Sequence, residues 1–264
     1  LSDKPEKGKI SVLKRGEMFS SVEVSEDRYV PVYSEKGLKG AEFEVTAAED
    51  IYTPDGTLRL AKNALADTLV TDETGGAVSR ELYPGKYYLS EKTAPDGFVL
   101  NAEPSEITVA SGTVTAELKN ERKKQEYKIQ KNLETDQKFG IGFNGEIFNI
   151  RFGLFSKTEL TALDGSIIPA DGLIEIATPD EDGFLSFTAD MPYNAECYIK
   201  ELETDGHYIL SDEQYLSGDT AENKIIRGSI EGLKTDPNGR VLKDAVIGLF
   251  YPFETEFSAD TAIE

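Results

Sequence analysis

Residues 87–100 have the sequence YYLSEKTAPDGFVL, and residues 197–210 have the sequence CYIKELETDGHYIL. In each stretch an alternating apolar segment ends in a glutamate, Glu91 or Glu201, and an aromatic residue, Phe98 or Tyr208, follows seven positions later. Alternation with a period of two is typical of a half-buried β-strand. The chain therefore carries one strand-rich pattern twice, which predicts two copies of one small domain.

Further repeats indicate where these units begin. Three strand-like segments end in lysine, at Lys14, Lys131 and Lys234, and the start of the following core strand recurs at residues 38–43 and 242–247. We therefore predict a first domain over residues 1–122, a second over 123–227, and the opening strands of a third, incomplete domain over 228–264.

The rest of the chain also favours strands joined by turns. Alternating segments occur at residues 107–109, 114–118 and 148–154, and acidic, glycine-containing turns such as residues 53–56 lie between such segments. Residues 58–66 fit a helix or a loop equally well. The prediction is an all-β protein.

The composition excludes several functional classes. With 49 acidic and 28 basic side chains the net charge is −21, and such a surface repels phosphate backbones, so we expect no nucleic-acid binding. No segment approaches the roughly 20 apolar residues that cross a bilayer, and the first residues lack the pattern of a signal peptide. We expect a soluble, monomeric segment of a longer chain, with no membrane span of its own.

The single histidine and single cysteine leave almost no material for a His/Cys metal site or a Ser-His-Asp triad, so we expect no metal and no cofactor. Residues 140–145 match a dinucleotide-binding pattern, but the alternation that follows favours a plain glycine-rich loop. Residues 180–183 fit a solvated turn better than a calcium loop. Cys197 fits a packed thiol better than a reactive one, and His207 has no second ligand near it in sequence.

These patterns together resemble the CnaB or SpaA-type domains, immunoglobulin-like modules that build the stalks of adhesins and pilins on Gram-positive bacteria. The resemblance rests on the strand ending in Lys14, the Leu-x-Gly-Ala-x-Phe start at residues 38–43, the Tyr-Tyr-x-x-Glu-x-x-Ala-Pro-x-Gly-Phe segment at 87–98, and the closing strand ending in Asn120. It covers residues 8–121 and 125–228, and only opening strands in the last 36 residues. In the second copy, residues 204–207 replace Ala-Pro-x-Gly. The fold that the resemblance implies is a tandem array of immunoglobulin-like β-sandwiches.

The resemblance also implies a chemistry, in which a lysine and an asparagine become joined by a spontaneous isopeptide bond with a glutamate as helper. The residues that match are Lys14, Glu91 and Asn120 in the first domain, Lys131, Glu201 and Asn223 in the second, and Lys234 alone in the third. Burial lowers the pKa of an amine and raises that of a carboxyl group, so an apolar core favours a neutral nucleophile and a proton donor. The fold supplies the proximity, and each domain reacts once, so we expect self-modification rather than an enzyme with turnover.

One spacing differs between the two copies. Phe98 lies 22 positions before Asn120, whereas Tyr208 lies only 15 positions before Asn223. The last two strands of the second copy are therefore expected to be short. This puts Asn223 in question as the second acceptor, although we favour formation of the second bond.

The resulting functional expectation is a covalently locked stalk of a secreted, wall-attached surface protein. The alternative is a module that binds a host glycoprotein or polysaccharide. Residues 15–37 are an insertion in the first domain that predicts an extra hairpin, and this hairpin or nearby loops would form such a surface. Any host protein or glycan would otherwise contact other regions of the longer protein. No paired carboxylates suggest a hydrolase.

Overall fold

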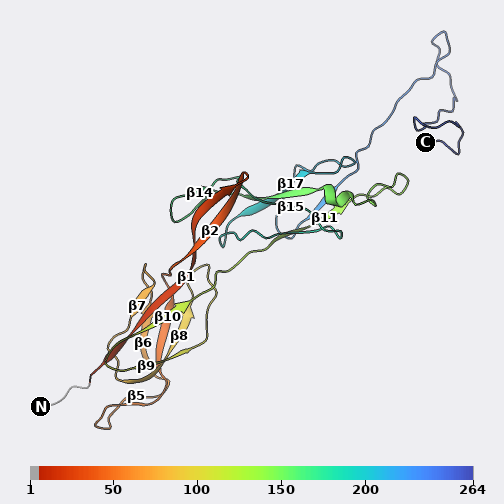
Figure 1. The fold of residues 1–264 in the computed structure, drawn as a ribbon. Coiled ribbons are helices and arrows are strands. Elements are labelled where there is room, and N and C mark those ends of the chain that lie inside the picture. The colour runs from red at the N-terminus through yellow and green to blue at the C-terminus, as the bar shows by residue number, and fades with distance from the viewer. Residues whose placement is uncertain (1–5, 264) are drawn as a thin grey trace. The chain divides into compact units, whose positions relative to one another are not determined.

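The computed structural model describes residues 6–263, and within them the regular secondary structure is almost entirely β-strand (Figure 1). The predicted all-β class is confirmed, with two immunoglobulin-like sandwiches in tandem. None of the helices in this part of the chain is long and apolar enough to cross a membrane.

The first sandwich consists of two facing sheets. One sheet has the order β10-β1-β2, with β7 also paired to β1, and the other has the order β6-β3-β8-β9. The strands are β1 (Gly8–Ser25), β2 (Arg28–Gly37), β3 (Glu42–Ala47), β6 (Leu65–Val70), β7 (Gly76–Val78), β8 (Gly85–Thr93), β9 (Ser105–Val109) and β10 (Gly112–Lys119), with a small ribbon of β4 (Ile51–Tyr52) and β5 (Leu58–Leu60).

The second sandwich repeats the strands of the first except for β2, which has no counterpart. Its sheets have the orders β16-β11-β19 and β15-β12-β17-β18, with β13 and β14 as the small ribbon. The elements are β11 (Tyr127–Leu133), η1 (Glu146–Asn149), β12 (Arg151–Ser156), β13 (Leu160–Thr161), β14 (Ile167–Ile168), β15 (Leu173–Ala177), β16 (Phe184–Phe187), β17 (Cys197–Glu203), β18 (Gln214–Tyr215) and β19 (Thr220–Asn223). In both sandwiches the first strand pairs in parallel with the last, β1 with β10 and β11 with β19.

Two local predictions are wrong. Residues 58–66 form neither a helix nor a simple loop, because residues 58–60 are β5, which pairs with β4, and residues 65–66 begin β6, which pairs with β3. Residues 148–149 belong to η1, a single 3-10 turn, and the strand begins only at Arg151. The preceding Gly145 has φ of 83°, a conformation that favours glycine and starts this turn.

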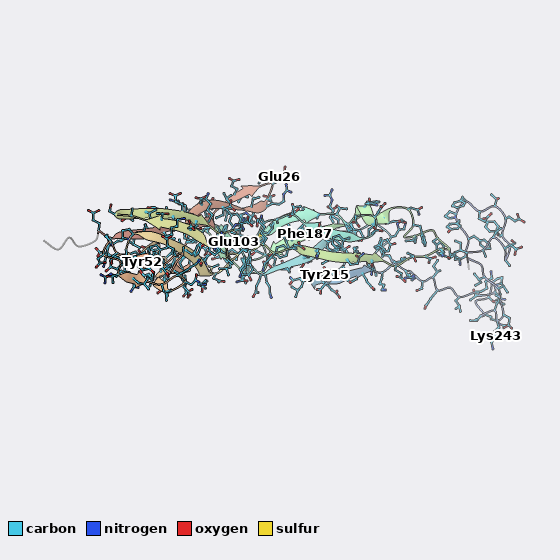
Figure 2. The ribbon with its side chains drawn as sticks, turned by 90° about the horizontal axis from the view of Figure 1, so that it is seen from below. Glu26, Tyr52, Glu103, Phe187, Tyr215 and Lys243 are labelled. Carbon is cyan, nitrogen blue, oxygen red and sulfur yellow. The ribbon has the colours of Figure 1, made fainter. Side chains whose placement is uncertain are left out.

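Each sandwich has its own hydrophobic core. The first is built from both of its sheets around Val12, Phe43 and Leu89, and the second around Ile129, Phe152 and Ile199. Phe187 and Tyr215, labelled in Figure 2, belong to the second core. Because period-two alternation directs every second side chain inward, each strand contributes to a core with one face only.

Strand β1 continues beyond the first sandwich and forms a hairpin with β2 over residues 15–37. The outer part of this hairpin lies beside β14 and β15 of the second sandwich (Figure 1). Phe19, Val22 and Tyr29 pack against the second core, and the backbone N–H of Val22 donates a hydrogen bond to Ser166 Oγ at 2.8 Å. The tip of the hairpin, residues 23–27 with Glu26 among them, is exposed (Figure 2).

Residues 226–264 form a separate unit. Its described part, up to residue 263, contains turns and one isolated bridge between Thr235 and Val241, and no strand of a third sandwich. Its large apolar side chains are mostly exposed, among them Val246 and Phe253. A strand is stable only when it is paired, and this unit has almost no backbone pairing.

Candidate functional site

A lysine, a glutamate and an asparagine meet inside the first sandwich. Lys14 on β1, Glu91 on β8 and Asn120, directly after β10, have exposed fractions of 1%, 5% and 6%. Lys14 Nζ lies 3.2 Å from Glu91 Oε1. Asn120 Nδ2 donates a hydrogen bond of 2.9 Å to the same carboxylate oxygen. The carboxyl group therefore lies between the amine and the amide.

The second sandwich contains an equivalent cluster. Lys131 on β11, Glu201 on β17 and Asn223 at the end of β19 have exposed fractions of 2%, 1% and 1%. Lys131 Nζ lies 3.6 Å from Glu201 Oε1, and Asn223 Nδ2 donates to that oxygen at 2.9 Å. Here the amine also contacts the amide directly, because Lys131 Nζ donates to Asn223 Oδ1.

The short final strands of the second sandwich do not shift Asn223 out of place. Lys14 is paired with Leu118, and Asn120 follows two residues later. Lys131 is paired with Ala221, and Asn223 again follows two residues later. The segment between Tyr208 and β19 is shorter than its counterpart in the first sandwich, and its strand β18 is only two residues long. The relationship between lysine and asparagine is therefore the same in both sandwiches.

The surroundings of both amines favour the neutral, nucleophilic form. Burial lowers the pKa of Lys14 below its ordinary value of 10.5, and the nearby Glu91 offsets only part of this effect. Burial lowers the pKa of Lys131 in the same way, against the opposing effect of Glu201. Each Nζ also lies 5.5 Å from the centre of an aromatic ring, Phe43 for Lys14 and Phe152 for Lys131.

Backbone N–H groups hold the two glutamates in place. Asn101 N–H donates to Glu91 Oε2 at 3.0 Å, and Ser211 N–H donates to Glu201 Oε2 at 3.0 Å. Each donor lies ten residues after its glutamate. One carboxyl oxygen is thus fixed by the backbone, while the other, Oε1, faces the lysine and the asparagine.

The two clusters differ around the asparagine amide. Asn120 Oδ1 is buried and has no hydrogen-bond partner among the described residues. Asn223 Nδ2, in contrast, lies within hydrogen-bond distance of three oxygens, those of Glu201, Thr204 and Ile209. The second cluster therefore constrains its amide more completely than the first.

Sequence reasoning missed several members of these clusters. Phe43 and Phe152 are strand residues whose pairing partners are Glu91 and Glu201, and strand pairing between residues this far apart gives no signal in the sequence. In the sequence Thr204 stands out only as a departure from Ala-Pro-x-Gly. The backbone donors of residues 101 and 211 carry no side-chain signal.

The remaining candidates lie outside the clusters. Lys234 is exposed in the unit of residues 226–264. Burial raises the pKa of the Cys197 thiol, which disfavours the reactive thiolate. Asp180 Oδ1 accepts backbone N–H groups of Asp182 and Phe184, as in an ordinary turn. His207 contacts Asp205 within its own turn, and no group of three or more potential metal ligands occurs in residues 6–263.

Comparison with known proteins gives the same assignment for part of the chain. Residues 32–124 match the model of the SpaA prealbumin-like fold domain, a range that includes Glu91 and Asn120. The chain is 36% identical over 90 residues to the trypsin-resistant surface T6 protein of Streptococcus pyogenes serotype M6; the match covers 33% of this chain and 17% of that protein.

Solved structures also match the chain. The Bacillus anthracis TIE protein matches with a TM-score of 0.53 and 21% identity, over 84% of this chain and 34% of that one. The shaft pilin SpaA of Lactobacillus rhamnosus GG matches over 85% of this chain and all of its own, at 12% identity, but its TM-score of 0.31 carries no further argument. Residues 32–124 thus match the SpaA prealbumin-like fold domain, and the second sandwich has the same order of core strands as the first.

Proposed function

We propose that the chain is a structural, stalk-like part of a Gram-positive surface protein, and that each of its sandwiches is locked by an isopeptide bond, Lys14 to Asn120 and Lys131 to Asn223. The observation that carries this proposal is the recurrence of one buried arrangement, in which a carboxyl group lies between an amine and an amide in both sandwiches. Buried, unlinked lysines are rare, and two in equivalent places call for a common reason.

The chemistry needs no further reactant. A proton passes from the buried ammonium to the neighbouring carboxylate, which leaves a neutral amine and a carboxylic acid. The amine nitrogen then attacks the amide carbon of the asparagine, the new C–N bond forms, and the bond to Nδ2 breaks. The glutamate accepts a proton from the attacking nitrogen and delivers one to Nδ2, so the products are a secondary amide and ammonia.

Holding the reacting groups close together is what makes bond formation fast. The reacting groups are on neighbouring strands whose register is fixed by the backbone ladder, so their approach costs little further entropy. The aromatic rings of Phe43 and Phe152 keep water away from the amines, and the backbone donors to Glu91 and Glu201 orient the carboxyl groups.

The proposed bonds have a mechanical consequence. Each would join the first strand of a sandwich to the end of its last, so a pulling force would pass through the covalent bond and bypass the strands between. By analogy with a disulfide that closes a loop of about 100 residues, each bond would stabilise its sandwich by about 4–5 kcal/mol. This fits a stalk that resists shear and proteases.

The proposed location at the cell surface is supported by the relative from Streptococcus pyogenes, whose name describes a trypsin-resistant surface protein. The present chain spans 17% of that protein, so attachment to the wall and the partners of the whole protein belong to the proposal. The alternative role of the hairpin as a ligand surface is less favoured, because Phe19, Val22 and Tyr29 pack against the second sandwich.

Intact mass and peptide mapping test the proposal. We expect the folded chain to weigh less than its sequence by two molecules of ammonia, and a tryptic digest of the denatured protein to contain two branched peptides. Lys14→Ala and Lys131→Ala should each restore one ammonia. A chain of full sequence mass, with both lysine amines free to react with an acylating reagent after denaturation, would refute the proposal.

A further inference from the structure

The second cluster contains a hydroxyl group that the first lacks. Thr204 directly follows β17, three residues after Glu201, and the corresponding position in the first sandwich, three residues after Glu91, is Ala94. Thr204 Oγ1 lies 2.9 Å from Asn223 Nδ2. The same nitrogen lies 2.9 Å from Glu201 Oε1 and 3.0 Å from the carbonyl oxygen of Ile209.

These contacts define which way the amide faces. The backbone carbonyl of Ile209 can only accept a hydrogen bond, so the Asn223 atom that faces it must be the nitrogen. The amide oxygen is then on the other side, where Lys131 Nζ contacts it. The carbonyl carbon is thereby presented to the amine, and the nitrogen that must leave points away from it.

The number of oxygens around Asn223 Nδ2 equals the number of hydrogens on ammonia and exceeds the number on the starting amide nitrogen. Asn223 Nδ2 carries two hydrogens as an amide but has three oxygens within hydrogen-bond distance. When Lys131 Nζ bonds to the amide carbon and Nδ2 takes a third hydrogen from Glu201, the nitrogen leaves as ammonia with three N–H groups. All three oxygens then have a hydrogen to accept. The three oxygens therefore stabilise the nitrogen as it gains its third hydrogen and leaves more than they stabilise the starting amide, and an interaction that is stronger in the transition state than in the ground state accelerates the step.

We propose that Thr204 is a catalytic residue of the second sandwich, whose hydroxyl oxygen accepts a hydrogen bond from the leaving nitrogen of Asn223. The inference rests on the proposed isopeptide chemistry. The first sandwich has an alanine at this position, its Asn120 Nδ2 has Glu91 as its hydrogen-bond partner, and its Asn120 Oδ1 has none in the described part of the chain. The second bond therefore forms faster than the first, once each sandwich has folded.

The test follows both bonds in one chain. The full chain is made by cell-free synthesis, samples are denatured at timed intervals, and the two branched tryptic peptides are quantified. Thr204→Val keeps the shape of the side chain but removes the hydroxyl, and we expect it to slow the Lys131–Asn223 bond about tenfold, equivalent to about 1.4 kcal/mol. The Lys14–Asn120 bond should keep its rate and serves as the internal standard.

Controls separate the hydroxyl from general packing. Thr204→Ser should restore most of the rate, and Thr204→Ala, which copies the residue of the first sandwich, should be as slow as Thr204→Val and replaces it if that variant misfolds. Thr188→Val removes another hydroxyl of the same sandwich, one bonded to Glu175, and should leave both rates unchanged. If the Lys131–Asn223 bond forms as slowly in Thr204→Ser as in Thr204→Val, the hydroxyl has no role in the reaction.

The remaining outcomes distinguish this inference from the proposed function. If the unaltered chain forms both branched peptides and Thr204→Val forms them at unaltered rates, the role of Thr204 is wrong while the isopeptide chemistry stands. If the unaltered chain forms neither branched peptide, the isopeptide chemistry itself fails, and the role of Thr204 fails with it.

Discussion

Asn223 lies two residues beyond the strand position that pairs with Lys131, on the neighbouring parallel strand. Asn120 has the same relationship to Lys14, although the connection that leads to Asn223 is shorter. The separation of an amine from its amide thus depends on sheet register, which backbone hydrogen bonds maintain, and not on the number of residues in a loop. The following predictions use this relationship and the contacts around it.

Register, rather than loop length, should control the second bond. Insertion of Gly-Ser between Ser217 and Gly218 lengthens an exposed connection and should leave the Lys131–Asn223 branched peptide unchanged. Deletion of Glu222 should abolish it, because a shift of one residue moves the asparagine to the opposite face of the sheet. Peptide mapping of the folded variants checks both. A branched peptide in the deletion variant would contradict the register argument.

Glu91→Gln should prevent the first bond while preserving the fold. Glutamine has nearly the same shape and can still accept from Asn101 N–H, but it cannot pass a proton from Lys14 to the departing nitrogen. After correction for the mass difference between glutamate and glutamine, we expect the variant to weigh one ammonia more than the unaltered chain. Its circular dichroism spectrum should be unchanged. Normal cross-linking in this variant would rule out the proton-transfer role, and Glu106→Gln, at an exposed carboxylate, is the matched control.

Loss of the first bond should lower the stability of the first sandwich. In Asn120→Ala the amine of Lys14 has no amide to attack, so the covalent loop between β1 and the end of β10 is not closed. By the disulfide analogy we expect a loss of about 4–5 kcal/mol, seen in urea unfolding of the full chain. The transition of the second sandwich, reported by the protection of its own sites from protease, should change far less.

The same variant should show a distinctive pH dependence. Because burial lowers the pKa of Lys14 in the folded state below 10.5, the unfolded chain binds more protons than the folded one between the two pKa values. The free energy of unfolding of Asn120→Ala should therefore rise as the pH increases through that window, up to 10.5, relative to the linked chain. In the linked chain Lys14 is an amide and does not titrate. A difference between the two that is constant with pH would show that the free amine is not buried.

Contacts around Arg122 should hold the two sandwiches of residues 1–225 together. Arg122 donates two hydrogen bonds to Asp190, at 3.1 and 2.6 Å, and its guanidinium lies 3.5 Å from the centre of the Tyr33 ring. Asp190→Ala leaves this poorly exposed cation without its main partner. We expect this to destabilise the contact between the sandwiches by about 1–3 kcal/mol.

Loosening of this contact in Asp190→Ala should make trypsin cleave faster at Lys123 and Lys124, the exposed residues that follow Arg122. Glu196→Ala removes an exposed ion pair with Lys157 in the same sandwich and should leave the cleavage rate unchanged. Equal cleavage of Asp190→Ala and the unaltered chain would show that the hairpin alone joins the sandwiches.

Much of the architecture was predictable because it is local or periodic. Period-two alternation and the repeat around Glu91 and Glu201 established the all-β class and the tandem arrangement. The six residues of the two clusters could also be named, because the resemblance to CnaB or SpaA-type domains implies a lysine, a glutamate and an asparagine in this order in each copy. Residues 58–66 and 148–149 were misassigned because short apolar segments fit several local structures equally well, and pairing with neighbours decided between them.

The amino-acid sequence by itself determined the residue types and their order: a lysine that ends the first strand, a glutamate in the middle, and an asparagine that ends the last strand. Only the tertiary structure decided that the short connection before Asn223 leaves the register intact, that Phe43 and Phe152 lie against the amines, and that Thr204 reaches the leaving nitrogen. It also decided that the hairpin packs against the second sandwich. The reason is that hydrogen-bond ladders and burial join residues about 100 positions apart, and neither spacing nor hydropathy along the chain contains those distances.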